Sequence, residues 1–240
     1  MLKIHLLAIF DSGESLPFEE LGEEIKKKIA RIKSESQQNE SIAAYSLLSF
    51  ICKEKGAKTP TVVYTTEGKP SFAVEKKDGK KYNTPPFFFN ISHSEGVVAL
   101  VTSDEACELG IDVQKEPNAA VLERISKRFL GADKSPALSG NKGEELSFEL
   151  LYYNIKEGKI NRLNTRDGEA LFSLRKINND LEKDDPLTRW TLIEALIKAS
   201  GGGFLDYPKV KILAEKMHVA SFSLTVGEKR YSLSVAKQKQ

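Results

Sequence analysis

Short apolar runs alternate with amphipathic stretches along the first half of the chain. Runs rich in Leu, Ile, Val and Phe predict strands at 2–9, 61–65, 72–74 and 97–101. Helical spacing of apolar residues predicts helices at about 18–33 and 41–55, the second ending just before Gly56. Gly68-Lys69-Pro70 predicts a turn between two of the strands.

The order of strand, helix and further strands recurs after residue 105. A strand at 107–114 and a helix at 118–130 precede a polar, glycine-bearing stretch at 132–147, which predicts a surface loop. Asp185 and Pro186 are typical of a helix N-cap and first residue, and that helix is expected to end at Gly201-Gly202-Gly203. The other predicted strands lie at 147–155, 158–163, 169–176, 208–213, 218–225 and 230–236. The chain is therefore expected to form an α+β fold of two closely packed lobes, 1–104 and 105–240, each with antiparallel strands and a helix.

Composition and charge narrow the class of protein. The chain has 240 residues, of which 40% are hydrophobic and 29% charged, as in ordinary globular proteins. A net charge of +2 gives no overall field that favours DNA or an acidic membrane surface. Two cysteines, Cys52 and Cys107, cannot form a disulfide framework or a zinc site by themselves. With no apolar run typical of a secretory signal or a membrane span, a cytoplasmic protein is expected.

The densest chemistry lies between residues 87 and 115. Ser92-His93-Ser94 lacks the G-x-S-x-G setting of a serine hydrolase, and predicts a turn that binds an anion such as phosphate. A histidine that only makes structural hydrogen bonds is an equally weighted alternative. Asp112 stands in an apolar strand, where a buried acid needs a partner. A salt bridge is the commoner explanation, but Gln114 shares its face of the strand, and the two side chains offer oxygen ligands that suit Mg²⁺.

A third candidate element is the helix that follows Asp185. Trp190, Glu194 and Lys198 are spaced four residues apart and therefore share one stripe of the helix. An exposed Glu–Lys pair is the default explanation of such spacing. The three glycines that follow, at 201–203, allow the backbone to approach a ligand closely.

Taken in order, four motifs resemble the 4′-phosphopantetheinyl transferases of the surfactin-synthetase-activating type. The pattern of that family is G-K-P, F-N-x-S-H-S, G-[IV]-D-[IV]-[EQ] and W-[ST]-x-K-E-[AS]-x-x-K-x-x-G-x-G-[LF]. The corresponding segments are 68–70 (GKP), 89–94 (FNISHS), 110–114 (GIDVQ) and 190–204 (WTLIEALIKASGGGF). Any one motif is weak, but the ordered set, spread over residues 41–236, is specific.

The resemblance implies a pseudo-twofold α+β monomer that binds coenzyme A (CoA) and Mg²⁺ between its lobes. It implies transfer of the 4′-phosphopantetheine arm of CoA to a serine of an apo carrier protein of fatty acid, polyketide or peptide synthesis, with release of 3′,5′-ADP. The resemblance also implies roles for single residues. Asp112 and Glu194, with Gln114, would hold the metal, and Glu194 would also accept the serine proton. Ser92 and His93 would bind a CoA phosphate, and Lys198 would contact the pyrophosphate. At the nucleotide end, Lys69 and Pro70 would line the adenine-ribose part and Ser41 would contact the nucleotide.

The chain departs from the family pattern at several places. Ile193 replaces the lysine that usually precedes the glutamate, and Gln114 stands where a third acid is common. The segment 34–41 lacks the basic residues that usually precede its helix, so Lys28, Arg31 and Lys33 are all candidates to bind the 3′-phosphate. The stretch 132–185 is long, and is expected to form an added hairpin near the carrier-protein surface.

These departures leave a second function open. A catalytically weakened or inactive relative would act as a module that binds CoA or a carrier protein. A nucleic-acid binder is disfavoured by the nearly neutral charge.

Overall fold

The computed structural model describes residues 2–9, 21–57, 61–73, 85–129, 146–154, 159–177, 185–203 and 208–239. The strands are β1 (Leu2–Ile9), β2 (Val62–Tyr64), β3 (Pro70–Phe72), β4 (Phe88–Ser94), β5 (Val97–Ser103), β6 (Leu109–Lys115), β7 (Leu146–Asn154), β8 (Lys159–Arg162), β9 (Phe172–Lys176), β10 (Met217–Val226) and β11 (Lys229–Gln238). The helices are α1 (Glu23–Ile29), α2 (Glu35–Glu54), α3 (Ala119–Phe129), α4 (Thr165–Leu171), α6 (Pro186–Ala199) and α7 (Val210–Lys216).

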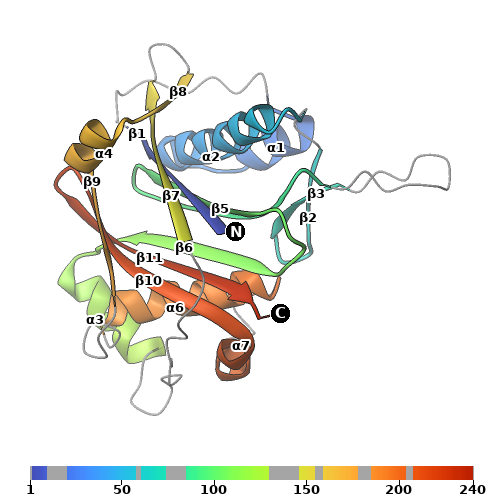
Figure 1. Cartoon of the computed structure of the whole chain (residues 1–240). Helices are drawn as coiled ribbons and strands as arrows, with labels where there is room; N and C mark the ends of the chain where they lie inside the picture. Colours follow the sequence, from blue (N-terminus) through green and yellow to red (C-terminus); the bar gives the residue numbers. More distant parts are fainter. Residues whose placement is uncertain are drawn as a thin grey trace.

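Two sheets form the centre of an α+β fold (Figure 1). One sheet has the strand order β4-β5-β1-β7-β8, and the other has the order β6-β11-β10-β9. Figure 1 shows α2 and α1 above the first sheet and α6, α3 and α7 below the second. The sheets therefore form the two inner layers, and a long helix covers the outer face of each.

Alternation along the strands builds separate apolar layers. On β1, Leu2, Ile4 and Leu6 point to the second sheet, where they pack against residues of β6, β10 and β11. Leu7 points to the opposite face and packs against α2. All seven residues of β5 are buried, because both faces of that strand are covered.

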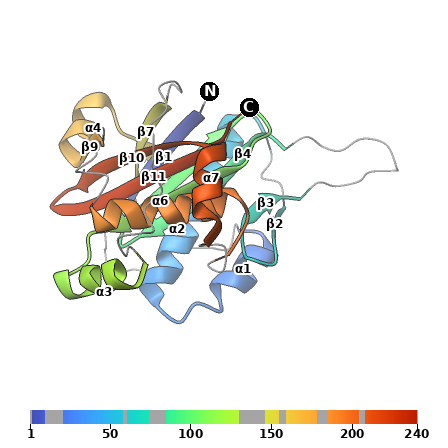
Figure 2. The same ribbon diagram turned by 90° about the horizontal axis from the view of Figure 1, so that it is seen from below.

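Helix α6 lies unusually close to β6. A Cβ atom added at Gly110 would lie 1.9 Å from the carbonyl oxygen of Ala195 and 2.5 Å from the amide nitrogen of Ala199. Only glycine permits this approach, which brings the side chains of α6 next to those of β6. Figure 2 shows α6 running across the face of the sheet that contains β10 and β11. The helix begins where the sequence predicts it, because the Asp185 carboxylate accepts a hydrogen bond of 2.8 Å from the Thr188 amide and Pro186 follows.

Strand β4 joins the two sheets through its side chains. Both β4 and β6 are edge strands, and three amides of β6 donate to side-chain oxygens of β4 instead of to backbone carbonyls. The pairs are Ile111 N to Asn90 Oδ1 at 3.0 Å, Val113 N to Ser92 Oγ at 3.3 Å, and Lys115 N to Ser94 Oγ at 3.0 Å. Asn90, Ser92 and Ser94 thus satisfy an edge that would otherwise leave buried amides without acceptors.

The α+β class that the sequence predicts is confirmed, and three local predictions are wrong. Ser92-His93-Ser94 belongs to β4, and the turn lies one step later, at Glu95 and Gly96, which have φ angles of 39° and 96°. Residues 208–213 do not form a strand; Val210, Leu213 and Ala214 lie at helical spacing on α7 and pack against α6. The predicted strand at 169–176 begins three residues later, because 165–171 forms α4.

The prediction of purely antiparallel sheets is also wrong at one place. β1 pairs with β7 in parallel, Leu2 opposite Leu146. A long stretch of chain separates these strands, and a long connection permits parallel pairing. β7 and β8 follow residue 104 in the chain but belong to the sheet of β1, so the sheets do not divide at one chain position. The division into lobes 1–104 and 105–240 stays a prediction, and most of the loop predicted at 132–147 lies outside the described residues.

Within the described ranges, no helix is both long and apolar enough to cross a membrane.

Candidate functional site

A cavity of about 470 Å³ lies where α1, α2, the β2–β3 hairpin, β4 and the C-terminal end of α6 meet. Its volume is typical of a small-molecule site. Six residues that the sequence predicts for binding line it: Ser41, Lys69, Pro70, Ser92, His93 and Lys198. Segments that are far apart in the chain therefore meet around one space.

Lys198 on α6 lines this cavity, and Asp112 on β6 lies behind it. The Asp112 carboxylate is 5% exposed, and its Oδ1 atom accepts hydrogen bonds from Lys198 Nζ at 2.6 Å and Ser92 Oγ at 2.9 Å. Its Oδ2 atom is buried and has no hydrogen-bond partner among the residues that the structure describes. A buried carboxylate oxygen without a partner is costly, and it indicates a position that a ligand can satisfy.

Glu194 supplies a second carboxylate beside Asp112. Burial and the negative charge of Asp112 raise the pKa of Glu194, against the opposing effect of Lys198. The two acids are therefore close enough to feel each other's charge. A raised pKa suits a carboxylate that accepts a proton near neutral pH.

By themselves, Asp112 and Glu194 would supply only part of the ligands of a metal ion. No cluster of three or more His, Cys, Asp or Glu side chains that could hold a metal occurs in the described part of the chain. Mg²⁺ fits such a site when waters and ligand phosphates supply the other oxygens. Gln114 lies two residues beyond Asp112 on β6 and is partly exposed.

His93 is held by a buried acid that the sequence did not reveal. Glu40 on α2 is 7% exposed, and its Oε2 atom lies 2.9 Å from His93 Nδ1, while its Oε1 atom accepts a hydrogen bond from the Gly96 amide at 3.2 Å. The other ring nitrogen, Nε2, lies 3.4 Å from Ser41 Oγ on the cavity wall. Glu40 thus fixes the orientation of the imidazole from behind, as a positioning residue.

Ser92 and His93 point in opposite directions because they are neighbours on a strand. The Ser92 hydroxyl donates to Asp112 and accepts from the Val113 amide and from Lys198 Nζ, the last at 3.1 Å. Its hydrogen-bonding capacity is thereby used within the protein. In this structure Ser92 orients Asp112 and Lys198.

Lys69 connects the β2–β3 hairpin to the end of α6. Its Nζ atom donates to the carbonyl oxygen of Ala199 at 2.8 Å and lies 3.2 Å from Glu108 Oε2. A cation at the C-terminal end of a helix is favourable. The positive φ angle of Gly68, 84°, forms the turn that presents Lys69 and Pro70 to the cavity.

Lys28 brings a further positive charge to the cavity. Its Nζ atom lies 4.1 Å from the centre of the Tyr64 ring, and the Tyr64 hydroxyl donates to that of Tyr45 at 2.8 Å. Burial lowers the pKa of Lys28. Of the three basic residues considered for the 3′-phosphate, Lys28 lines the cavity, whereas Arg31 and Lys33 are not among its lining residues.

The structure therefore places six of the predicted residues around one cavity and adds Glu40 and Tyr64. Asp112 and Glu194 lie next to Lys198, but these two acids and Gln114 are not among the described residues that line the cavity. The sequence indicates Glu40 only indirectly, because Glu40 directly precedes the candidate residue Ser41. The sequence does not separate Lys28 from Arg31 and Lys33, whereas in the structure Lys28 is the one that lines the cavity. No local pattern identifies Tyr64.

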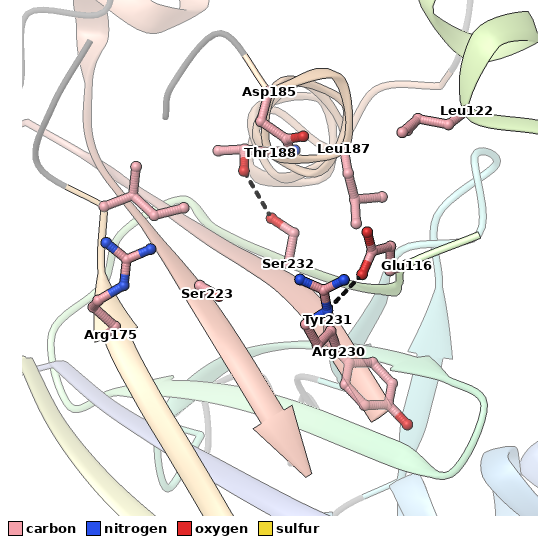
Figure 3. Close-up of a pocket in the computed structure, with 11 residues that line it drawn as sticks. Glu116, Leu122, Arg175, Asp185, Leu187, Thr188, Ser223, Arg230, Tyr231 and Ser232 are labelled. Carbon is pink, nitrogen blue, oxygen red and sulfur yellow. Dashed lines mark hydrogen bonds and ion pairs between the residues drawn. The ribbon is translucent and has the colours of Figure 1, made fainter. Parts of the chain in front are cut away.

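A second, smaller pocket of about 180 Å³ lies near the N-terminal end of α6 (Figure 3). Figure 3 shows Arg230 and Glu116 pointing toward each other across its wall, with Arg230 Nε 2.9 Å from Glu116 Oε2. Among its lining residues in the described part of the chain there is no site residue predicted from the sequence. The larger cavity is the candidate site.

In comparisons with known proteins, no protein-family model matches the chain, and no curated protein sequence matches it.

Proposed function

We propose that this chain transfers the 4′-phosphopantetheine arm of CoA to a serine of an apo carrier protein and releases 3′,5′-ADP. The observation that carries the proposal is the cavity itself. Lys69, His93 and Lys198 come from three separate motifs and line one space beside Asp112. Several cations around one cavity, with the Asp112 and Glu194 carboxylates next to Lys198, suit a ligand with a diphosphate group.

The proposal assigns a part of CoA to each side of the cavity. Lys28, which lies over the Tyr64 ring, would receive the 3′-phosphate and nucleotide end, beside Ser41, Lys69 and Pro70. His93, oriented by Glu40, would donate from Nε2 to a phosphate oxygen. Asp112 and Glu194 would hold Mg²⁺, which when bound neutralises charge on the diphosphate.

The chain's own residues would handle the proton and the developing charge. The serine oxygen of the carrier protein forms a bond to the phosphorus next to the pantetheine arm. The bond from that phosphorus to the 3′,5′-ADP oxygen breaks. Glu194, whose pKa is raised, accepts the serine proton directly or through water. Lys198 is placed to stabilise the negative charge on the departing group.

The departure at Ile193 fits an intact site. Ile193 is 2% exposed and packs in the apolar cluster between α6 and its neighbours. It is not among the residues that line the cavity. Position 193 therefore faces the apolar interior beside α6 in this chain.

The family's fold, with two pseudo-twofold lobes, is part of the same proposal. The two sheets, each covered by a long helix, support it. A monomer in the cytoplasm that recognises a fatty acid, polyketide or peptide carrier protein stays a prediction.

Mass spectrometry of carrier proteins tests the proposal. Purified protein with CoA, Mg²⁺ and a panel of apo carrier proteins should add the mass of phosphopantetheine to at least one carrier. Asp112→Asn and Glu194→Gln should each lower the rate by about 10²–10³-fold, as loss of a group that stabilises transition-state charge does. Glu123→Gln is the matched control, because Glu123 is an exposed acid paired with Lys127 on α3. Its rate should stay unchanged.

Two results would contradict the proposal. No mass gain on any carrier, with CoA still raising the melting temperature, would favour a CoA-binding module without catalysis. Unchanged turnover in either acid variant would remove the assigned role of that acid.

A further inference from the structure

We infer that Lys198 occupies the place beside Asp112 that a divalent ion and a diphosphate fill together, and so makes their binding cooperative. The inference rests on the proposed function and deepens it. It concerns the order in which the ligands enter the cavity and the residue that sets this order.

The geometry divides the Asp112 carboxylate between two occupants. Oδ1 is taken by Lys198 Nζ at 2.6 Å and by the Ser92 hydroxyl at 2.9 Å. Oδ2 is buried and has no partner among the described residues. A divalent ion that binds Asp112 therefore meets a carboxylate that an ammonium group already holds.

Two cations on one carboxylate repel each other strongly at such short range. In the absence of other ligands, the ammonium group of Lys198 already neutralises the charge of Asp112. A metal ion would therefore be attracted less strongly by Asp112 and Glu194 than by two carboxylates without a neighbouring lysine. A diphosphate changes this balance, because its oxygens can bridge the metal and the ammonium group. The metal and the diphosphate should then each bind better in the presence of the other.

The Lys198 side chain faces the cavity. Its side chain is 30% exposed and lines the cavity, whereas Asp112 is buried behind it. The second contact of Lys198, with Ser92 Oγ at 3.1 Å, is a single hydrogen bond to a hydroxyl. A flexible lysine can give up both contacts for a phosphate oxygen on the open side.

Thermodynamic linkage fixes the form of the result. If the metal raises the affinity for CoA by some factor, CoA raises the affinity for the metal by the same factor. Neutralising Lys198 should strengthen binding of the metal alone and weaken binding of CoA. The factor by which the metal and CoA raise each other's affinity should then fall by about as much as the affinity for the metal alone rises.

Calorimetric titrations with Mn²⁺ and with CoA test this inference. Lys198→Gln keeps a hydrogen-bond donor near Asp112 and removes the charge, and Lys198→Met removes both. For Mn²⁺ alone we expect about tenfold tighter binding to Lys198→Gln than to the unmodified chain. Mg²⁺ should tighten CoA binding by about tenfold or more in the unmodified chain, and by a clearly smaller factor in either variant. Lys127→Met removes an exposed lysine of the Lys127–Glu123 pair and is the matched control, expected to behave as the unmodified chain.

The possible results separate this inference from the proposed function. If Mn²⁺ binds both Lys198 variants no more tightly than the unmodified chain, or binds none of them, the inference is wrong. This holds even when CoA binds and transfer occurs. If CoA does not bind to any form of the protein, the proposed function is wrong. Tighter Mn²⁺ binding to the variants would still support Lys198 as a competitor of the metal at Asp112.

Discussion

Gly110 offers the most direct test of how the fold builds the site. Replacing it by alanine places a methyl group 1.9 Å from the carbonyl oxygen of Ala195 and 2.5 Å from the amide nitrogen of Ala199. Ordinary contacts begin at 3.4 Å, so α6 would have to retreat from β6 by about 1.5 Å. Both clashing atoms belong to the backbone, so no change of side-chain rotamer can relieve the contact.

The cost of Gly110→Ala follows from two terms. Overpacking of this kind costs about 1–3 kcal/mol. A shift of α6 also breaks the contact of 2.6 Å between Lys198 and Asp112, and leaves a buried carboxylate with less compensation. We expect a total loss of about 3 kcal/mol in the free energy of unfolding. For a chain of this size, that loss lowers the melting temperature by roughly 6–12 °C.

Urea denaturation and thermal unfolding measure this loss. Gly22→Ala is the matched control, because an added Cβ there meets nothing within 4 Å. Its stability should stay within about 0.5 kcal/mol of the unmodified chain. CoA affinity should also fall in Gly110→Ala, because Lys198 and Asp112 no longer share one geometry. A Gly110→Ala protein as stable as the Gly22→Ala control would refute the close packing of α6 on β6.

Three further predictions concern the cavity and the pH dependence of stability. Lys28→Met should weaken binding of CoA by about 10–100-fold and that of dephospho-CoA much less, in calorimetric titration; equal losses would show that Lys28 does not contact the 3′-phosphate. Glu40→Gln should raise KM for CoA by about tenfold with a smaller change in kcat, since it loosens His93 without removing it, and steady-state kinetics with the reverse split would contradict this role. Burial lowers the pKa of His5 below 6.5, although the nearby Glu149 carboxylate acts to raise it. Burial acts to raise the pKa of Glu149, but hydrogen bonds from His5 and Arg162 outweigh this and lower that pKa to about 2. Both groups therefore bind protons more readily in the unfolded chain. The free energy of unfolding should fall as the pH drops below 6.5, because of His5, and fall further below 4.5, because of Glu149. Each proton contributes at most about 1.4 kcal/mol per pH unit. His5→Gln should flatten the first part of this dependence in urea titrations at several pH values, and an unchanged slope would exclude His5 as its source.

Most elements could be predicted from the sequence because local chemistry determines them. The α6 helix has an aspartate cap, a proline at its first position and glycines past its end, and each of these has a local physical reason. Strand β5 is a continuous apolar run that is buried on both faces. Such signals do not depend on what the rest of the chain does.

The errors arose where tertiary context decides. In 208–213 the alternation of Val210, Lys211 and Ile212 suggests a strand. In the structure Val210, Leu213 and Ala214 pack against α6, and Ile212 is 56% exposed. The parallel pairing of β1 with β7 leaves no trace in either strand, because a strand's pattern reports which face is buried and not its neighbour. Sequence patterns therefore predict the elements better than their partners.

For the candidate site, the residue types were predictable and their contacts were not. His93 and Asp112 stand out because histidines are few and a buried acid needs a partner. Glu40 does not stand out, since a glutamate in a polar helical turn is ordinary, and its burial behind His93 depends on how α2 packs against β4. The pairing of Lys198 with Asp112, 86 positions apart, follows from the close approach of α6 to β6 at Gly110.

Strand β4 explains why the cavity forms where it does. Its alternate side chains Asn90, Ser92 and Ser94 accept the amides of β6, so the two sheets are joined at this edge without a backbone ladder. Side-chain hydrogen bonds hold strands further apart than the ladder of a continuous sheet does. The opposite alternation turns His93 toward α2, where Glu40 holds it at the cavity wall. One strand thus joins the sheets with one set of side chains and presents a polar group to the cavity with the other. A short polar motif such as F-N-I-S-H-S then has a structural reason at every second position, independent of any ligand. Its agreement with a family pattern therefore becomes an argument for function only together with Asp112 and Lys198, which the same strand contacts through Ser92.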